Sequence, residues 1–224
     1  MVALFVALMF IGFVLVDFFV QRLEARRAAA AAPADRLWNV PQGFYLSESH
    51  TWFRPDASSG VRVGADALVA HALGAVEKVV APKLGAMVEA GQPLFYLENH
   101  GSGLEIDGSI TGQVVAVNSN LESRPQLVAK DPYGSGWICA ITPSKPADTD
   151  AGLRSGAKAA AWLEQEFHRL REFLSLQVAP DLALSATRLD GGLPTVGSLT
   201  HLPPEGWCAF EEEFLRPRRT PPAP

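Results

Sequence analysis

Histidine is the side chain in this sequence best suited to acid–base or metal chemistry, because it titrates near neutral pH and binds metal ions. Four histidines invite an interpretation: His50, His100, His168 and His201. His50 has no partner that would support catalysis, and we interpret it as structural. His100 lies in a Gly- and Ser-rich turn, either as a solvated side chain or as a metal or proton ligand. His168, among charged residues, and His201, before two prolines, are expected at the surface. The sequence therefore predicts no catalytic residue and no metal site.

Motifs of known enzyme classes are missing from the sequence. There is no Gly-rich phosphate loop, no Cys-pair metal pattern and no nucleophile elbow. The acidic run 211–213 is flanked by Trp207, Phe210 and Phe214. It is either a solvated helix face or a surface that docks on a basic partner. The formal net charge of -5 gives no electrostatic basis for binding nucleic acid. We therefore expect a protein that is not an enzyme.

The elements that must position these residues begin with a β-rich domain over residues 37–143. Short runs rich in Val and Ile alternate with Gly, Pro, Asn and Ser, a pattern typical of a small sandwich or barrel. The predicted strands are 60–64, 77–81, 93–97, 104–107, 112–117 and 136–141. Residues 66–74 are expected to form a short helix with Asp66 as its N-cap and Gly74 at its C′ position.

A helical extension is predicted over residues 144–216, and it begins with a polar linker at 145–153. Residues 156–177 have the periodicity of an amphipathic helix. Its apolar face is predicted to hold Trp162, Phe167, Leu170, Phe173 and Leu174, opposite a polar face with Glu164, Glu166, Arg169, Arg171 and Glu172. A second, short helix is expected at 207–215. The basic, Pro-rich tail 217–224 is expected to be disordered.

The first 22 residues are predicted to form a transmembrane helix. They are almost all apolar, with Asp17 as the single charged side chain before residue 21, and a bilayer core needs about 20 apolar residues in a helix. A cleaved signal peptide and a buried helix of a soluble domain are the alternatives. Both fit less well, because the basic residues follow the apolar run. Asp17 is interpreted either as interfacial or as a contact to a neighbouring transmembrane helix.

The orientation of this span follows from Arg22, Arg26 and Arg27, because basic residues favour the cytoplasmic side. We expect a single-pass protein of a bacterial inner membrane, with a periplasmic N-terminus, a juxtamembrane helix or linker at 23–36 and a cytoplasmic main domain. Cys139 and Cys208 are then expected to be reduced, buried and small apolar residues. A disulfide is possible only if the orientation is reversed.

A family resemblance covers Ser49 to Ile141, a little under half of the chain. Its motifs follow one another in a single order: Ser49-His-Thr-Trp-Phe53, Val63-Gly64, Ala72-Leu-Gly74, Leu84-Gly85, Gly91, Glu98, Ile110-Thr-Gly-Gln-Val114, Val117-Asn118 and Pro132-Tyr-Gly-Ser-Gly-Trp-Ile138. In these residues the chain resembles the H protein of the glycine cleavage system. The resemblance implies a mainly β, lipoyl/biotinyl-type barrel-sandwich hybrid, in which Trp52 and Trp137 cap the core.

The resemblance also implies a hairpin that carries lipoate on a lysine, in a run Glu-Ser-x-Lys-Ala. The corresponding run here is Glu98-Asn-His-Gly-Ser102, so Gly101 occupies the expected position of the lipoyl lysine. No lysine occurs between Lys83 and Lys130, and neither Ser nor His supplies the primary amine that lipoyl attachment requires. We therefore expect no cofactor and no carrier function at this hairpin.

Three functions fit these features. The first is a structural, accessory subunit of a membrane complex of photosynthetic reaction-centre or respiratory type, with integral membrane subunits and lipid as partners. Its analogy to the H subunit of purple-bacterial reaction centres is one of architecture only. The alternative is a membrane-tethered carrier related to the glycine cleavage H protein. The third is a membrane-fusion-type adaptor, which fits less well because the halves of the domain are contiguous here.

Overall fold

Two antiparallel sheets form the framework of the protein in the computed structural model, which describes residues 39–57, 60–144, 152–177 and 193–216. The strands of this part of the chain are β1 (Tyr45–Leu46), β2 (Thr51–Asp56), β3 (Gly60–Ala65), β4 (Lys78–Val80), β5 (Met87–Val88), β6 (Pro93–Asn99), β7 (Ser102–Asp107), β8 (Gly112–Val117), β9 (Cys139–Pro143) and β10 (Arg154–Ser155). The helices are α2 (Ala67–Leu73), α3 (Asn120–Ser123), α4 (Leu127–Lys130), α5 (Gly156–Gln177), η2 (Ser198–His201), α7 (Pro204–Phe210) and η3 (Glu211–Leu215). The mainly β architecture agrees with the predicted fold class.

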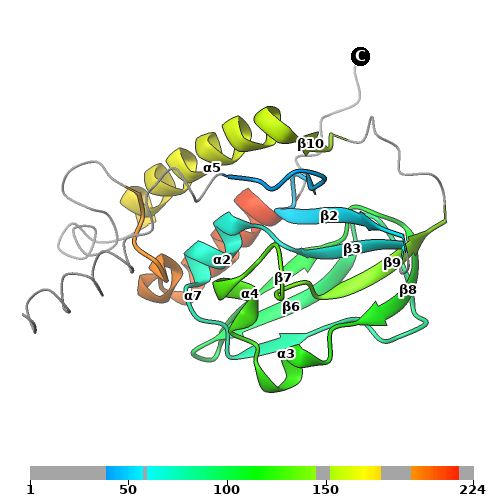
Figure 1. Cartoon of the computed structure of the whole chain (residues 1–224). Helices are drawn as coiled ribbons and strands as arrows, with labels where there is room; N and C mark the ends of the chain where they lie inside the picture. Colours follow the sequence, from blue (N-terminus) through cyan, green and yellow to red (C-terminus); the bar gives the residue numbers. More distant parts are fainter. Residues whose placement is uncertain (1–38, 58–59, 145–151, 178–192, 217–224) are drawn as a thin grey trace, which may run out of the picture. The chain divides into compact units, whose positions relative to one another are not determined.

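The larger sheet has the order β10-β1-β2-β3-β9-β8-β5, and the smaller one has the order β4-β6-β7 (Figure 1). The register of β2 and β3 places Trp52 opposite Gly64. A Cβ atom on Gly64 would lie 2.7 Å from the indole of Trp52, so only glycine allows the ring to lie flat across β3. Trp52 is 1% exposed and donates from Nε1 to the carbonyl oxygen of Pro132 at 3.0 Å. This ring closes the core, as predicted.

Helix α2 is held in the core by both of its ends. Asp66 is the N-cap, and its Oδ1 accepts from the backbone N–H groups of Leu68 and Val69 at 2.9 and 3.2 Å. Gly74 ends the helix at a φ of 72°, where a Cβ would lie 2.6 Å from the backbone of Gly197. Both predicted caps are therefore confirmed.

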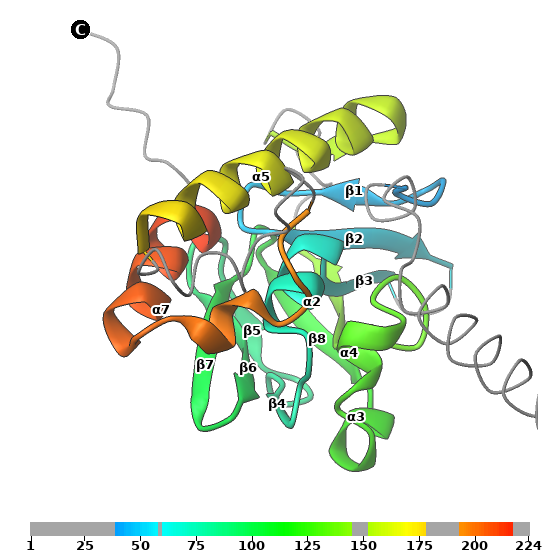
Figure 2. The same cartoon turned by 90° about the vertical axis from the view of Figure 1, so that its left-hand side faces the viewer.

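The amphipathic helix predicted at 156–177 is confirmed as α5, which contacts α2 and β1. Figure 2 shows α5 above these two elements, with α7 at its side. Phe173 of α5 contacts Phe210 and Phe214 with ring centroids 6.1 and 5.6 Å apart, and the latter two rings stack at 4.9 Å. This aromatic cluster joins the C-terminal helices to α5.

Three sequence predictions about burial need correction. Glu166, assigned to the polar face of α5, is 8% exposed, because the side of α5 packs against the segment that carries His50. Trp137 is only half-buried, with Arg62 over its ring at 5.1 Å. Cys208 is exposed, whereas Cys139 is buried as expected.

The C-terminal helix expected at 207–215 begins earlier, at Pro204, and ends in the π-helical turn η3. Strand β9 begins at Cys139, three residues later than predicted, because the carbonyl oxygens of Ser135 and Trp137 accept from the amide of Asn118 instead of pairing in the sheet. The other predicted strands overlap observed ones.

The predicted membrane span at 1–22, the juxtamembrane segment at 23–36 and the tail at 217–224 lie outside the described residues. Within the part of the chain that the structure describes, every helix is too short or too polar to cross a membrane.

Candidate functional site

The hairpin between β6 and β7 is the place where the resemblance predicts a carrier lysine. Asn99 pairs with Ser102 in the ladder, which leaves a two-residue turn of His100 and Gly101. Both residues have positive φ, 50° and 77°, as a type I′ turn requires. A Cβ added to Gly101 would meet no atom within 4 Å, so the tip faces open space. The structure therefore has a tight hairpin here, with His100 and Gly101 at its tip.

Charged side chains from β4 and the residue before it hold the tip in place. The carboxylate of Glu77 accepts the backbone N–H of His100 at 3.0 Å, and its other oxygen lies 3.2 Å from His100 Nδ1. The ammonium of Lys78 lies 3.4 Å from the carboxylate of Glu98 across the strand pair. At the base of the hairpin, the buried Asn99 donates from Nδ2 to the carbonyl oxygen of Leu73, at the end of α2. The tip is therefore pinned from the side and from below.

A lipoyl group does not fit this hairpin. The amide bond needs a primary amine, and residues 93–107 contain no lysine. Lys78 brings an amine beside the hairpin, but it stands on the neighbouring strand opposite Glu98 and not at the turn. His100 is therefore the side chain that the tip presents, with 70% of its surface exposed.

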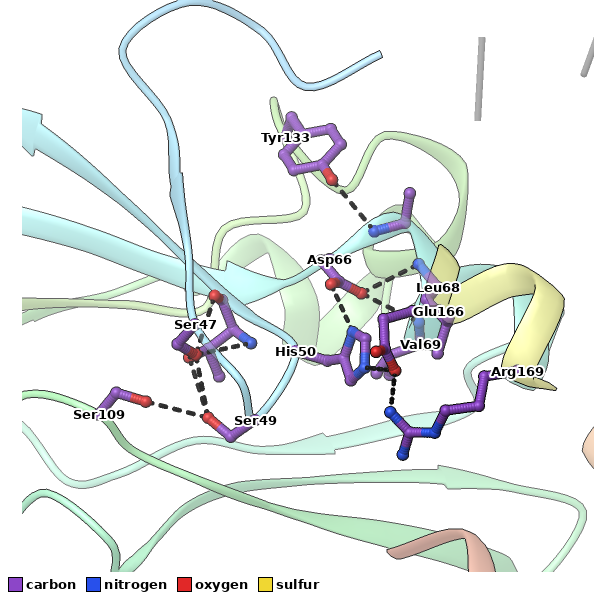
Figure 3. A network of polar contacts seen from close by, with 12 residues as sticks. Ser47, Ser49, His50, Asp66, Leu68, Val69, Ser109, Tyr133, Glu166 and Arg169 are labelled. Carbon is purple, nitrogen blue, oxygen red and sulfur yellow. Dashed lines mark hydrogen bonds and ion pairs between the residues drawn. The ribbon is translucent and has the colours of Figure 1, made fainter. Parts of the chain in front are cut away.

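The second candidate is a buried charge network centred on His50 (Figure 3). His50 is fully buried at a φ of 56°, and its Nδ1 lies 2.7 Å from Oδ2 of Asp66. Its Nε2 lies 3.6 Å from Oε2 of Glu166, an ion pair just beyond hydrogen-bonding distance. Glu166 in turn accepts from Arg169 at 2.5 Å. The network joins the loop before β2, the start of α2 and the middle of α5.

The local backbone fixes the position of His50. Its N–H donates to the carbonyl oxygen of Ser47 at 3.2 Å, and its own carbonyl oxygen accepts from Asp66 at 2.9 Å. Ser47 is also bonded to Thr51 through their hydroxyls at 2.7 Å. The neighbouring Ser49 donates to the carbonyl oxygen of Asp107 at 3.1 Å and so ties this loop to the end of β7. These bonds stabilise the left-handed conformation of a residue that has a Cβ.

The protonation state of the network follows from its burial and charges. Burial alone lowers the pKa of His50, but the hydrogen bond to Asp66 and the negative charges of Asp66 and Glu166 outweigh this and raise the pKa to about 9. Burial raises the pKa of Glu166, but His50 and Arg169 outweigh it, so the pKa of this carboxyl is lowered. His50 is therefore an imidazolium between two carboxylates at neutral pH.

Aromatic rings and further ion pairs surround the network. Trp162 stacks on His50 with ring centroids 4.9 Å apart, and the guanidinium of Arg154 lies 4.8 Å above the same indole. Arg154 is paired with Glu48 at 3.1 Å. A pocket of about 580 Å³ opens over Trp162, between α5 and η3. Because the charges nearest this pocket neutralise one another, we interpret the network as a structural clamp and not as an acid–base centre.

The other residues that the sequence analysis singled out lie either on the surface or in contact with other elements. His168 and His201 are exposed, as expected. The acidic run is not simply solvated, because Glu211 accepts the backbone N–H of Glu105 on β7 at 2.6 Å and Glu213 lies 3.4 Å from Arg169. Among the described residues, no group of three or more His, Cys, Asp or Glu side chains is arranged to hold a metal ion.

Sequence reasoning missed the partners of His50. Asp66 was recognised only as an N-cap, and Glu166 was placed on the solvent-facing side of its helix. A signal was present in the residue type: Asp66 has two oxygens, and an N-cap uses only one of them. Nothing in the sequence indicates that Glu166, 116 positions after His50, is the second partner.

Comparison with known proteins identifies the family of this domain. A sequence profile of the family described as Glycine cleavage H-protein matches residues 44–166, more than half of the chain. The glycine cleavage system H protein of Magnetococcus marinus is 35% identical over 126 residues, which cover 56% of this chain and 89% of that protein. The corresponding protein of Klebsiella pneumoniae is 38% identical over 128 residues, 57% of this chain and 98% of that one.

Among solved structures, a glycine cleavage system H protein from Mycobacterium marinum matches with a TM-score of 0.48 and 27% identity, covering 56% of this chain and 99% of that one. The family match continues past Pro143, through the linker and into α5, where it ends at Glu166. The sandwich of two sheets, the hairpin and the profile match over residues 44–166 agree on the family. The chain belongs to the glycine cleavage H-protein family.

Proposed function

We propose that this chain is a membrane-anchored H-like protein that carries no lipoyl group and serves as a non-catalytic accessory subunit of a membrane complex. The observation that carries the proposal is Gly101 at the tip of the hairpin, where an acyl carrier needs an amine. The predicted span at 1–22 would hold the protein in a bacterial inner membrane, with its main domain on the cytoplasmic side. Integral membrane subunits and lipid are the partners in this proposal.

The fixed tip of the hairpin supports a binding role rather than a carrier role. A swinging arm needs a long side chain that moves freely in solvent, whereas His100 is held by Glu77 through its backbone and its ring. A turn held in this way offers a partner one shape, at a low cost in conformational entropy on binding.

The C-terminal segment 193–216 supports the same proposal, because it lies beyond the family match and covers surfaces next to the hairpin. Gly197 packs against Gly74, and its N–H donates to the carbonyl oxygen of His71 at 2.9 Å. Helix α7 and η3 lie along β7, the strand that leaves the hairpin (Figure 2). A second protein that needed free access to both sides of the hairpin would collide with segment 193–216.

The alternative is a membrane-tethered carrier, and family membership favours it. The relatives described above are all glycine cleavage system H proteins, and members of this family are carriers and not themselves enzymes. This supports a relative of the H carrier over a reaction-centre subunit, so a photosynthetic partner is not part of the proposal. Lys78, whose side chain is 62% exposed, is the amine through which such a carrier would have to act near this hairpin.

The mass of the intact protein tests the proposal. The full chain is expressed together with lipoylating enzymes, and wild type is expected to show its unmodified mass. Gly101→Lys is the positive control, because the space around Gly101 is open and the left-handed backbone costs a lysine about 1–2 kcal/mol. A lipoyl-sized increment on wild type would refute the proposal. Loss of that mass increment in the Lys78→Arg variant would assign the modification to Lys78.

Purification from native membranes tests the second half of the proposal. The full chain, extracted in mild detergent, is expected to co-purify with proteins that have several membrane spans. Recovery as a free monomer under the same conditions would contradict an accessory role, whether or not the protein carries a lipoyl group.

A further inference from the structure

Exposed apolar side chains gather on one stretch of the surface, residues 78–88, which runs from β4 through the following loop into β5. Val80, Leu84 and Met87 are 47, 69 and 64% exposed. Val115, on the neighbouring strand β8, is 39% exposed. Single exposed apolar residues are common, but Leu84 and Met87 stand three residues apart in one turn, and exposed apolar side chains that gather in this way favour a binding surface. We call Val80, Leu84, Met87 and Val115 the loop patch.

The backbone presents the loop patch in a fixed conformation. Gly85, at a φ of 82°, donates its N–H to the carbonyl oxygen of Val114 at 2.8 Å, and Ala86 accepts from the N–H of Val114 at 2.9 Å. The side chain of Gln113 adds a bond to the carbonyl oxygen of Gly85 at 3.2 Å. Because the turn is attached to β8 at three points, Leu84 and Met87 are held outward and cannot fold back to cover themselves.

The charged residues of this stretch are basic, and Glu77 and Glu89 flank it. Residues 78–88 read Lys-Val-Val-Ala-Pro-Lys-Leu-Gly-Ala-Met-Val and contain two lysines and no acidic residue, in a protein with a formal charge of -5. Lys78 is paired with Glu98, whereas Lys83 makes no ion pair with the residues that the structure describes. Apolar side chains beside basic ones favour the interface of a bilayer that contains anionic lipids.

We propose that the loop patch contacts the lipid bilayer, with Leu84 and Met87 entering the headgroup region and Lys83 facing anionic phosphates. This inference rests on the membrane anchor of the proposed function. The residues between the predicted span and residue 39 reach at most ~55 Å, enough for this face to turn toward the bilayer. Figure 2 shows β4 at the end of the body opposite α5.

A depth probe on the full chain tests this contact. Cys208→Ser removes the exposed thiol, Cys139 is buried, and Leu84→Cys then places an environment-sensitive fluorophore on the patch. Leu176→Cys is the matched control, because Leu176 is an apolar residue that is 85% exposed at the end of α5. The labelled proteins are reconstituted in vesicles of phosphatidylcholine and phosphatidylglycerol. We expect lipid-attached nitroxide to quench the probe at position 84 at least threefold more than the probe at position 176, and aqueous iodide to show the reverse.

Equal iodide quenching at the two positions would overturn the inference. A probe at position 84 that is aqueous on lipid vesicles but shielded in native membranes would also overturn it, in favour of a protein partner. Lys83→Glu should reduce nitroxide quenching at position 84 severalfold with phosphatidylglycerol present and leave it unchanged in pure phosphatidylcholine. Retained quenching at position 84 in the first vesicles would contradict the role of Lys83.

Carbonate extraction separates this inference from the anchor. If the full chain resists extraction, the predicted anchor is supported, and the depth probe alone tests whether the loop patch contacts lipid. If it is extracted, co-flotation with the same vesicles becomes the test. Wild type should float and the double variant Leu84→Asp/Met87→Asp should not, whereas equal behaviour of the two would refute the lipid contact. An unchanged thermal midpoint would show that the double variant is folded.

Discussion

Replacing Asp66 with Asn removes the negative charge beside His50 and leaves an oxygen that can still cap α2 for Leu68 and Val69. Asn and Asp are about equally good N-caps, so the helix itself should be unaffected. The pKa of His50 is about 9 in the folded protein, against 6.5 as its ordinary value. One pKa unit corresponds to about 1.4 kcal/mol, so the charged His50 contributes up to ~3 kcal/mol to folding.

The sign of this contribution fixes its dependence on pH. Because the folded pKa is raised, the stabilisation by His50 is fully present below pH 6.5 and is lost as the pH rises through 9. At pH 7 it still amounts to about 2–3 kcal/mol, and at pH 9.5 almost all of it is lost. Asp66→Asn should therefore destabilise the protein by up to ~3 kcal/mol at pH 7, and the difference from wild type should fade toward pH 9.5.

Urea unfolding of the full chain in mild detergent measures this difference. Trp52 and Trp162 report on the two sides of the network by fluorescence, and the free energy of unfolding is compared at pH 6, 7, 8.5 and 9.5. Asp56→Asn is a control for a surface carboxylate, since Asp56 pairs with Arg62 at the edge of β2. A difference below 0.5 kcal/mol at pH 7, or one that does not change up to pH 9.5, would refute the assignment of His50 as a buried imidazolium.

Three further predictions follow from local geometry. Gly74→Ala should cost more than about 2 kcal/mol of unfolding free energy, because its Cβ would lie 2.6 Å from another backbone segment. Gly101→Ala also has a positive φ, but its Cβ would meet open space, so it should cost about 1–2 kcal/mol. Equal thermal midpoints would contradict this account. An aromatic disulfide reagent should modify Cys208 within seconds in the native state and Cys139 only after unfolding, because burial also raises the pKa of the Cys139 thiol to about 12. Glu211→Gln should leave the thermal midpoint at pH 7 unchanged or raise it. Burial raises the pKa of the Glu211 carboxyl, and a glutamine oxygen can still accept the N–H of Glu105. A clear fall in the thermal midpoint would show that the charge of Glu211 stabilises the contact.

Local rules predicted much of the fold because they act over a few residues. The ends of α2 follow from Asp66 and Gly74, and the full length of α5 follows from its apolar period. The hairpin, by contrast, was predicted from the family resemblance, and its tight turn needs the two positive φ angles that His100 and Gly101 adopt.

The parts that could not be predicted depend on contacts between distant segments. Periodicity ranks the faces of α5 by polarity, and it cannot reveal that the edge carrying Glu166 meets a buried cation. The exposure of Cys208 depends on how α7 is rotated against β7, which no local pattern encodes. The approach of Gly197 to Gly74 brings together residues that are more than a hundred positions apart.

The bond from Glu105 to Glu211 also affects how copies of this protein behave toward one another. Strand β7 is the outer strand of the small sheet, and a free outer strand invites pairing with a strand of another molecule. The carboxylate of Glu211 takes up one of the free N–H groups, and η3 lies along the rest of β7. A shortened chain that ends before residue 193 would lose this cover. Such a chain is open to sheet-to-sheet dimerisation and aggregation, which the C-terminal helices prevent in the full protein.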